Sequence, residues 1–352
     1  MEKLKIKFII FLKKENFIKF GDIVDKISCP ICNNKNFEMI LKKDDLSKYY
    51  HIVKCKNCDL VFINPLPTEE DLNKYYNTEY AVPEYQKIKL VKKAKKILNL
   101  LKKYRLSSNS RILEIGASHG FFLNEAKKQG FIPYGVELSK KACNNAKKCF
   151  GINIENVDFL QSSFINKKEC FDVVVLLDVL EHLTNQNEIL NGINTVLKRN
   201  GIVILTLPNI NSWEFKICGR YWEWLSPPAH LFYYSPNTIK KMLKKHGFDI
   251  VHLETYYGDT AGNILFHIYL SFKQLLFYGL KYIKGRKKLL KIRENIRNNL
   301  RNETSKEGKE FVGIDFIIFK LCDILWKPFK SVDNWRCKKG KGASILVIAV
   351  KK

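Results

Sequence analysis

The fold is decided by the stretch "RILEIGASHG", residues 111–120. Its first half is largely apolar, which predicts a strand, and two glycines four residues apart then predict a turn in which the backbone approaches a ligand closely. The turn has neither the G-x-G-x-x-G spacing of a dinucleotide site nor the Gly-Lys-Ser/Thr of a P-loop. Glu114, two residues before the first glycine, would repel a phosphate. The stretch therefore predicts a ligand that carries an ammonium group and no phosphate.

Apolar runs recur along the chain after this strand. They lie at 133–138, 154–160, 172–178, 201–207, 248–254 and 344–352, and helical patterns separate most of them. Alternation of this kind predicts an α/β fold with helices on both faces of a mostly parallel sheet. We therefore expect a Rossmann-like, doubly wound, seven-stranded sheet, with a helical insertion before its last strand.

The order of these motifs resembles the class I S-adenosylmethionine-dependent methyltransferases. The resemblance rests on the glycine turn, on "YGVELS" (134–139) and on "FDVVVLLDVLEHL" (171–183), and it spans about 111–256 with the last strand. S-adenosylmethionine has an amino group, a carboxylate and a sulfonium cation but no phosphate, so it suits the turn. The resemblance implies an enzyme with this cofactor.

Carried over by position, the resemblance assigns the methionine end of the cofactor to the glycine turn. Glu114 would lie near the amino group, and Gly116 and Gly120 would let the backbone pass beneath the methionine moiety. Ser118 departs from the family, in which the middle of this turn is often glycine. We expect that departure to affect affinity more than class.

The remaining cofactor contacts are assigned in the same way. Glu137 would hold the two ribose hydroxyls, and Leu138 would pack on the adenine. Asp158 or Ser162 would lie by the adenine amino group, and Asp178 would border the sulfonium. For Glu137, a helix cap is the alternative role.

Two cysteine pairs, Cys29-x-x-Cys32 and Cys55-x-x-Cys58, indicate a metal site. Four thiolates complete a tetrahedral zinc shell and leave no open position, so the zinc would be structural. Coincidence in a chain with ten cysteines, or a redox pair, are the alternatives. The pattern predicts a small zinc-ribbon-like module near the N-terminus.

Two histidines are candidates for catalysis. His182 follows the strand in "DVLEHL", and His230 lies in "WEWLSPPAHLFYYSP" (222–236), an aromatic, proline-containing segment that we expect to face substrate as a loop or lid. A hydroxyl acceptor needs its proton removed, for which either imidazole is suited. A structural hydrogen-bonding role is the alternative for each.

The helix before the fold-deciding strand is expected to place Ile88, Val91, Lys95 and Leu98 along one face and to leave the run of lysines on the other face in solvent. Together these patterns divide the chain into five parts: a basic lead-in with the zinc module (1–67), a helical linker (68–106), the core (107–260), a basic helical insertion (261–343) and the last strand (344–352).

The insertion contains two amphipathic helices. In the first, a narrow polar stripe of His267, Ser271, Gln274, Lys281 and Lys284 follows helical spacing on an otherwise apolar surface. These helices are expected either to cap the active site or form a homodimer, or to attach the protein to an anionic membrane surface.

The formal net charge of +26 favours an anionic partner. The cysteine module, "INPLP" (63–67) and "PAHLFYYSP" (228–236) resemble methyltransferases of surface-glycan and deoxysugar pathways, which implies a sugar-type or lipid-linked glycan acceptor in surface polysaccharide biosynthesis. An RNA methyltransferase, or a zinc-containing nucleic-acid-binding protein on a degenerate methyltransferase fold, are the alternatives. We find no signal peptide or membrane span and expect a cytoplasmic protein, which would be peripheral on the inner face of the membrane if the insertion attaches it there.

Overall fold

The computed structural model describes residues 27–44, 49–76, 84–104, 106–257, 263–284, 317–318 and 320–352. Two sheets organise this part of the chain. The larger has six strands in the order β5-β4-β6-β7-β10-β9. Its strands are β4 (Arg111–Ile115), β5 (Ile132–Val136), β6 (Phe171–Leu177), β7 (Leu197–Pro208), β9 (Phe248–Tyr256) and β10 (Ser344–Lys351).

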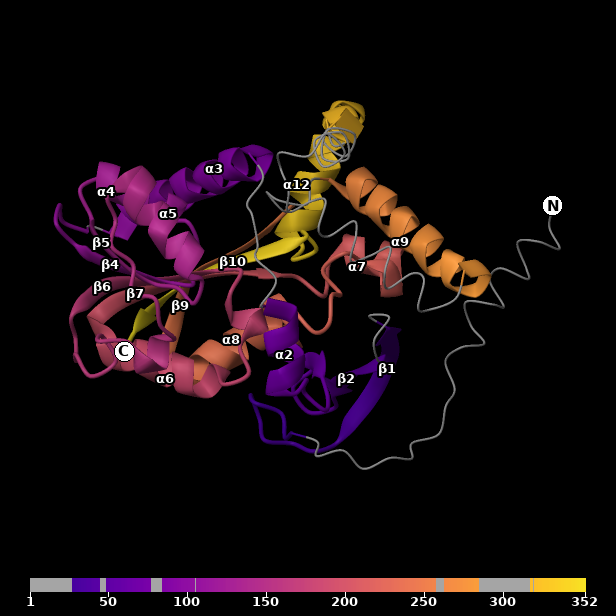
Figure 1. The fold of residues 1–352 in the computed structure, drawn as a ribbon, viewed down its shortest axis with the longest axis horizontal. Coiled ribbons are helices and arrows are strands. Elements are labelled where there is room, and N and C mark those ends of the chain that lie inside the picture. Colours follow the sequence, from indigo (N-terminus) through magenta and orange to yellow (C-terminus); the bar gives the residue numbers. More distant parts are fainter. Residues whose placement is uncertain are drawn as a thin grey trace.

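Strands β5, β4, β6 and β7 run parallel, whereas β10 is antiparallel to both of its neighbours, β7 and β9. The last strand is thus inserted between two strands that precede it in sequence. Helices cover both faces of this sheet (Figure 1). They are α3 (Glu84–Leu101), α4 (Phe121–Lys128) and α5 (Lys140–Phe150) on one face, and α6 (Gln186–Val196) and α8 (Pro236–Lys245) on the other. The expected doubly wound α/β fold is confirmed.

The seventh expected strand, at 154–160, is not formed in this sheet. Glu155 makes only an isolated parallel bridge with Val136 beside the edge strand β5. Pro133 in β5 has no N–H to offer a further strand, and Asp158 caps a short 3₁₀ turn that leads the chain away. The run is therefore a bridged loop, and the sheet has six strands in the described residues.

The core lies on both faces of the sheet because successive strand residues alternate between them. On one face Ile112 packs in a cluster with α3, whose Ala94, Ile97, Leu98 and Leu101 are buried. The predicted face of this helix was partly wrong, since Ile88 is exposed. The buried face of α3 differs from the expected one by a rotation of the helix about its axis. Lys93 lies on this buried face.

The second sheet is antiparallel, with the order β1-β2-β3-β8. Its strands are β1 (Phe37–Asp44), β2 (Tyr49–Cys55), β3 (Val61–Ile63) and β8 (Phe232–Tyr233), and α2 (Glu69–Tyr76) follows β3. Strand β8 comes from the segment that carries His230, and Phe62 stacks on Phe232 with ring centroids 5.9 Å apart. The cysteine module therefore shares one sheet and one core with the segment expected to face substrate.

That segment is mostly core rather than lid. Trp222, Phe232, Tyr233 and Tyr234 are all buried. The Tyr234 hydroxyl donates to Gln186 Oε1 at 2.6 Å, which ties the segment to the first turn of α6. Its aromatic content reflects packing between the two sheets.

The insertion begins with α9 (Ile264–Lys284), which lies against α7 (Trp213–Cys218) (Figure 1). After residues outside the description, 320–326 are helical and α12 (Lys330–Lys338) leads into β10. No helix in the described part of the chain is long and apolar enough to cross a membrane. The lead-in 1–26 and the basic stretch 285–316 lie outside the described residues.

Candidate functional site

The glycine turn leaves β4 and enters α4 through three residues with positive φ: Gly116, Ser118 and Gly120. A Cβ at Gly116 would lie 2.7 Å from Val179 Cγ2, so only glycine allows the turn to approach the end of β6 this closely. Ser118 has φ 46°, a left-handed conformation that glycine adopts more easily. The turn, residues 116–120, therefore forms a tight cradle between the end of β4 and the end of β6.

Glu137 holds this turn at the end of β5. Its carboxylate accepts a hydrogen bond from the Ser118 backbone N–H at 2.9 Å and another from the Ser139 N–H at 2.8 Å. The N-cap role considered for this residue belongs to Ser139, whose side chain accepts from Ala142 N at the start of α5. Glu137 is half-buried beside the cradle, where a carboxylate suits a pair of ribose hydroxyls.

Glu114 points from β4 into a buried space, and its Oε2 has no hydrogen-bond partner among the described residues. Burial, followed by the nearby Glu137 carboxylate, raises the pKa of Glu114 well above its usual value, while Lys93 opposes the shift. A buried acceptor without a partner is a position for a ligand's donor group. This observation fits the ammonium group of S-adenosylmethionine, and the cradle at Gly116 fits its methionine moiety.

Asp178 ends β6 in a left-handed conformation, with φ 56°. Lys93 Nζ, from α3, lies 2.6 Å from Asp178 Oδ2, and Thr206 of β7 donates to Oδ1 at 2.8 Å. Burial alone would raise the pKa of Asp178, but Lys93 and these hydrogen bonds lower it below the usual range. Asp178 is thus a fixed anion at the carboxyl edge of the sheet, next to the cradle.

The residues assigned to adenine have different environments. Leu138 is 71% exposed, so its apolar side chain is accessible to the adenine ring that it is predicted to contact. The Asp158 side chain accepts from Leu160 N, and the Ser162 hydroxyl donates to the Phe159 carbonyl at 2.7 Å. Both polar side chains therefore already serve a local 3₁₀ turn, and Ser162 is buried in it.

The structure brings the two candidate histidines together. The ring centroids of His182 and His230 are 4.6 Å apart and nearly perpendicular. His182 Nδ1 lies 2.8 Å from the Ala229 carbonyl, whereas His230 Nδ1 has no partner among the described residues. Burial, followed by His182, lowers the pKa of His230 to about 3, and burial also lowers that of His182. Both rings are therefore neutral at physiological pH.

Glu181 completes this group and was not singled out from the sequence. It is buried, neither carboxylate oxygen has a hydrogen-bond partner among the described residues, and Oε1 lies 4.0 Å from His182 Nε2. Burial, followed by Asp178, raises the pKa of Glu181 well above its usual value. In the sequence, Glu181 could have been identified from its position directly before His182 in "DVLEHL".

Lys93 and Thr206 were also missed. Lys93 stands in a run of lysines on α3, where nothing in the sequence distinguishes the buried member from its exposed neighbours. Thr206 is one polar residue in an apolar strand, which could have marked the edge of the site.

The four module cysteines converge on one point. Their Sγ atoms all lie within 4.8 Å of one another, with Cys29 and Cys58 at 3.3 Å and Cys32 and Cys55 at 3.5 Å. A hydrogen bond with Cys58 lowers the pKa of Cys29 to about 5, so one thiolate forms readily. None of the ten cysteines is in a disulfide. The cluster, Cys29, Cys32, Cys55 and Cys58, has the donor set of a closed four-thiolate metal site.

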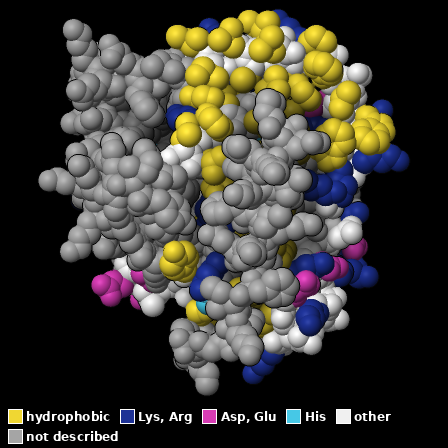
Figure 2. Space-filling view, turned by 90° about the vertical axis from the view of Figure 1, so that its right-hand side faces the viewer, with side chains coloured by type: hydrophobic (Ala, Val, Ile, Leu, Met, Phe, Trp, Pro, Cys, Tyr) yellow, Lys and Arg dark blue, Asp and Glu magenta, His cyan; other side chains and the backbone are white. Residues whose placement is uncertain are grey.

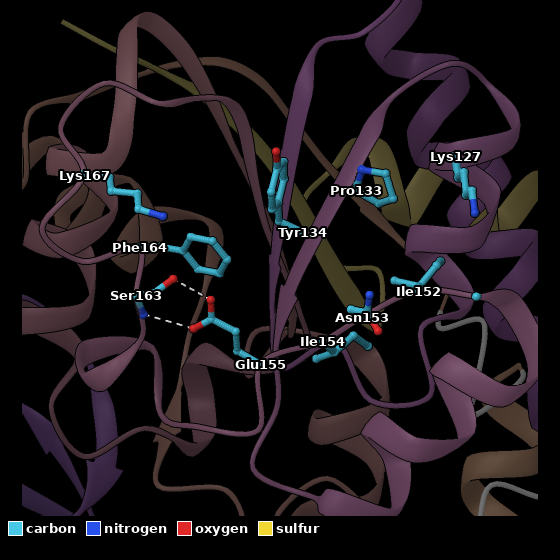
Figure 3. A pocket seen from close by; sticks show the side chains of 11 residues that line it. Lys127, Pro133, Tyr134, Ile152, Asn153, Ile154, Glu155, Ser163, Phe164 and Lys167 are labelled. Atoms are coloured by element: carbon cyan, nitrogen blue, oxygen red, sulfur yellow. Dashed lines mark hydrogen bonds between the residues drawn. The ribbon is translucent and has the colours of Figure 1, made fainter.

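A pocket of about 550 Å³ lies at the open edge of the large sheet, beside β5. Tyr134, Phe164 and Lys167 line it, and Ser163 hydrogen-bonds Glu155 across its floor (Figure 3). None of the candidate site residues lines this pocket. It occupies the place that a seventh strand would fill and is separate from the candidate site.

Comparison with known proteins agrees with this geometry. Residues 85–253 match the family model described as "Methyltransferase domain". Two curated relatives are both named ubiquinone biosynthesis O-methyltransferase. That of Bartonella tribocorum is 24% identical over 152 residues, or 41% of this chain and 62% of the relative, and that of Pelagibacter ubique is 24% identical over 170 residues, or 44% and 71%.

Among solved structures, one similar chain is described as a sarcosine dimethylglycine methyltransferase from Galdieria sulphuraria. It is 13% identical with a TM-score of 0.45, and the match covers 75% of this chain and 86% of that chain. The family match spans the cradle, Glu137, Asp178 and both histidines, and it ends before the insertion.

Proposed function

We propose that residues 85–253, which match the methyltransferase family model, form an S-adenosylmethionine-dependent methyltransferase domain, and that the whole chain methylates a hydroxyl of a sugar-type or lipid-linked glycan acceptor. The observation that carries oxygen as the acceptor atom is the group of Asp178, His182 and His230 beside the cradle. Neutral imidazoles accept hydrogen bonds from a hydroxyl, and Asp178 is a fixed anion beside the place where the sulfonium would lie. The names of the curated relatives also support transfer to oxygen.

The cofactor supplies an electrophilic methyl group on its sulfonium. Glu114 would bind its ammonium group, Glu137 its ribose hydroxyls and Leu138 its adenine. The chain's own contribution is alignment of the acceptor oxygen with the methyl carbon, which supplies much of the rate in transfers of this kind. His182 and His230 were expected as general bases, but a pKa of about 3 makes His230 a poor match for proton removal near neutral pH.

The glycan part of the proposal rests on charge and on motifs. The net charge of +26 suits acceptors whose sugar is carried on a nucleotide or on a lipid pyrophosphate. A ubiquinone-pathway hydroxyl is the second candidate, which the names of the relatives favour. RNA is the third candidate acceptor.

Transfer of a labelled methyl group from S-adenosylmethionine tests the three acceptor classes in parallel. We expect labelled product with lipid- or nucleotide-linked sugars. Label only in the ubiquinone precursor, or only in RNA, would overturn the glycan proposal and identify its replacement. Cofactor binding without transfer to any hydroxyl would overturn O-methylation itself.

We also propose that the cysteine cluster binds one structural zinc ion. Its four sulfurs leave no open position, and its backbone surroundings join it to the core: Lys241 Nζ of α8 donates to the Cys58 carbonyl at 3.2 Å. Because β3 pairs with β8, the ion would stabilise the segment that carries His230. Metal analysis of the purified full chain should find one zinc per chain, and absence of zinc would overturn the proposal.

A final part of the proposal places the protein in the cytoplasm, on the anionic inner face of a membrane. Helix α9 has its polar stripe turned inward: His267 and Ser271 are buried, and the Ser271 hydroxyl donates to the Tyr221 carbonyl at 3.0 Å. Its apolar Phe272 is 56% exposed. The part of the predicted stripe whose side chains the structure describes, His267, Ser271 and Gln274, therefore faces the protein.

The exposed side of α9 continues onto the segment before β10, because Asn263 Nδ2 donates to the Cys322 carbonyl at 2.8 Å. Figure 2 shows hydrophobic side chains gathered over the upper part of this side, with Lys and Arg along its edge. The exposed apolar residues of α9 and of the segment before β10, here called the apolar face, are Ile268, Phe272, Leu276, Ile317, Leu321, Ile324, Leu325, Phe329 and Trp335. Lys327 and Lys330 flank it, which favours an anionic lipid surface as its occupant.

Sedimentation with vesicles tests this occupant. We expect the chain to pellet with anionic vesicles at low salt, and the double variant Phe272→Glu, Leu325→Glu to stay in the supernatant. Val251→Glu, at an exposed apolar residue of β9 outside the face, is the matched control and should pellet like the wild type. A wild-type chain that stays in the supernatant and elutes as a homodimer would show that a second copy covers the face instead.

A further inference from the structure

We propose that Glu181, His182 and His230 bind one divalent cation, and that the remaining coordination positions of the cation take oxygen atoms of the acceptor. The inference deepens the proposed O-methylation and rests on it for the identity of the acceptor. It assigns a second metal site, distinct in its donors from the cysteine cluster.

The first support is the geometry of the three donors. One ligand atom from each residue lies within 4.8 Å of the others. Atoms bound to one cation at about 2.0–2.2 Å are separated by distances of this order or less, so small side-chain movements close the shell. Glu181 and His182 come from one 3₁₀ turn, Leu180–His182, and His230 comes from the segment fixed by β8. Two separate parts of the fold are thus held together around one point.

The second support is that three of the candidate ligand atoms have no hydrogen-bond partner among the described residues. Neither oxygen of the buried Glu181 carboxyl has a hydrogen-bond partner among the described residues, and the same holds for His230 Nδ1. Buried polar atoms without partners are costly and uncommon, and one bound cation would satisfy these three at once.

The third support is the orientation of His182. Its Nδ1 faces the Ala229 carbonyl at 2.8 Å, so Nδ1 carries the proton and donates. That hydrogen bond leaves the lone pair of Nε2 directed away from Ala229, and Nε2 is the atom 4.0 Å from Glu181 Oε1. A metal-binding histidine ordinarily donates its other ring N–H to a carbonyl or carboxylate in this way.

The position of the group relates it to methyl transfer. Val179 contacts the cradle at Gly116, and the 3₁₀ turn with Glu181 and His182 begins at the next residue. Both histidines are only partly buried, so an acceptor can reach the open side of the shell. Two imidazoles and one carboxylate leave further coordination positions, which suits an acceptor with two neighbouring oxygens, such as a vicinal diol of a sugar.

The chemistry balances without an oxidant or a reductant. The acceptor hydroxyl oxygen forms a bond to the methyl carbon while the carbon–sulfur bond breaks and its electron pair stays on sulfur. The hydroxyl proton leaves to solvent, and coordination to a cation eases this loss by lowering the pKa of the hydroxyl. In this assignment His182 and His230 act as ligands of the cation and not as general bases.

Manganese is the appropriate probe because Mn²⁺ prefers nitrogen and oxygen donors, whereas the soft thiolates of the cysteine cluster select zinc. Titration of the zinc-loaded full chain with Mn²⁺, followed by electron paramagnetic resonance, should reveal one bound ion per chain. Glu181→Gln should weaken its binding at least tenfold. His252→Gln, on β9 and outside the group, is the matched control and should bind Mn²⁺ like the wild type.

Calorimetry with S-adenosylmethionine reports whether the Glu181→Gln variant is folded. His230→Gln serves as a second variant. It removes the ligand atom Nδ1, which has no hydrogen-bond partner among the described residues. The inference is overturned if the wild type binds no Mn²⁺ at millimolar concentration, or if variants that bind the cofactor retain the Mn²⁺ affinity of the wild type. Mn²⁺ binding with no methylated hydroxyl acceptor would uphold the site and overturn the proposed function. Undiminished O-methylation by Glu181→Gln would uphold that function and overturn the role of the cation.

Discussion

Lys93 Nζ lies 2.6 Å from Asp178 Oδ2, although the two residues belong to elements on opposite sides of the glycine turn in sequence. The lysine is 5% exposed and the carboxylate 38%. Lys93 also lowers the pKa values of Glu114 and Glu181 against the effect of burial. One cation from α3 thus offsets three carboxyl groups at the carboxyl edge of the sheet.

Lys93→Met should destabilise the protein and weaken cofactor binding, because it leaves these carboxyl groups without their counterion. Loss of one partner of a fully buried pair costs about 3–5 kcal/mol, and the exposure of Asp178 reduces the expectation to about 1–2 kcal/mol. Urea unfolding and calorimetry with S-adenosylmethionine measure both effects. Lys92→Met, at the exposed neighbouring residue, is the control, and equal losses in the two variants would contradict the assigned role.

Glu137→Gln should weaken S-adenosylmethionine binding by about 10–100-fold, since a charged acceptor for two hydroxyls contributes about 1.5–3 kcal/mol per hydrogen bond. Calorimetric titration of the folded variant gives the affinity. Glu155→Gln is the control. It changes a carboxylate on the adjacent loop, and the two hydrogen bonds of that carboxylate are both with Ser163. If that control loses as much affinity as Glu137→Gln, Glu137 has no special part in binding.

Cys55→Ser should remove the zinc ion and lower the Tm by about 5–10 °C, because loss of a few kcal/mol shifts Tm by about 2–4 °C per kcal/mol in a domain of this size. The loss should reach the His230 segment through the pairing of β3 with β8. Metal analysis and thermal melting test this expectation. Cys170→Ser, outside the cluster, should keep both the metal and the Tm, and an unchanged Tm in Cys55→Ser would contradict a structural role.

His246 makes stability depend on pH. Its Nδ1 lies 2.8 Å from the side-chain amide of Asn191 and its Nε2 lies 2.9 Å from that of Asn187; the neutral ring has one N–H and donates to one of the two amides. Burial, followed by Lys245, lowers the pKa of His246 to about 4. The unfolded chain, with a histidine pKa of about 6.5, takes up the proton first. The stabilising contribution is therefore fully present above about pH 6.5 and is lost as the pH falls towards 4.

Between pH 8 and pH 5 this residue should cost the wild type about 2 kcal/mol of unfolding free energy. His246→Gln should remove that part of the loss, as urea unfolding at the two pH values would show. His252→Gln serves as the control and should lose stability as the wild type does. An identical pH dependence in wild type and His246→Gln would contradict the assignment.

Local patterns were sufficient for the six strands of the large sheet, the glycine turn and the cysteine pairs. Burial, period and spacing act within a few residues in each of these, so the sequence carries them directly. The pattern at 154–160 was misleading because strand formation needs a partner edge, and β5 with Pro133 offers a poor one. The rotation of α3 was not predictable either, because several of its lysines and apolar residues fit more than one face.

The sequence by itself determined the class of fold, the glycine turn between Gly116 and Gly120, and the two cysteine pairs. Only the tertiary structure decided that Lys93 is buried against Asp178, that Glu181 joins His182 and His230, and that His267 and Ser271 of α9 face inward. Each of these is a contact between segments far apart in the chain. Such contacts depend on how whole elements pack, which no local period or spacing encodes.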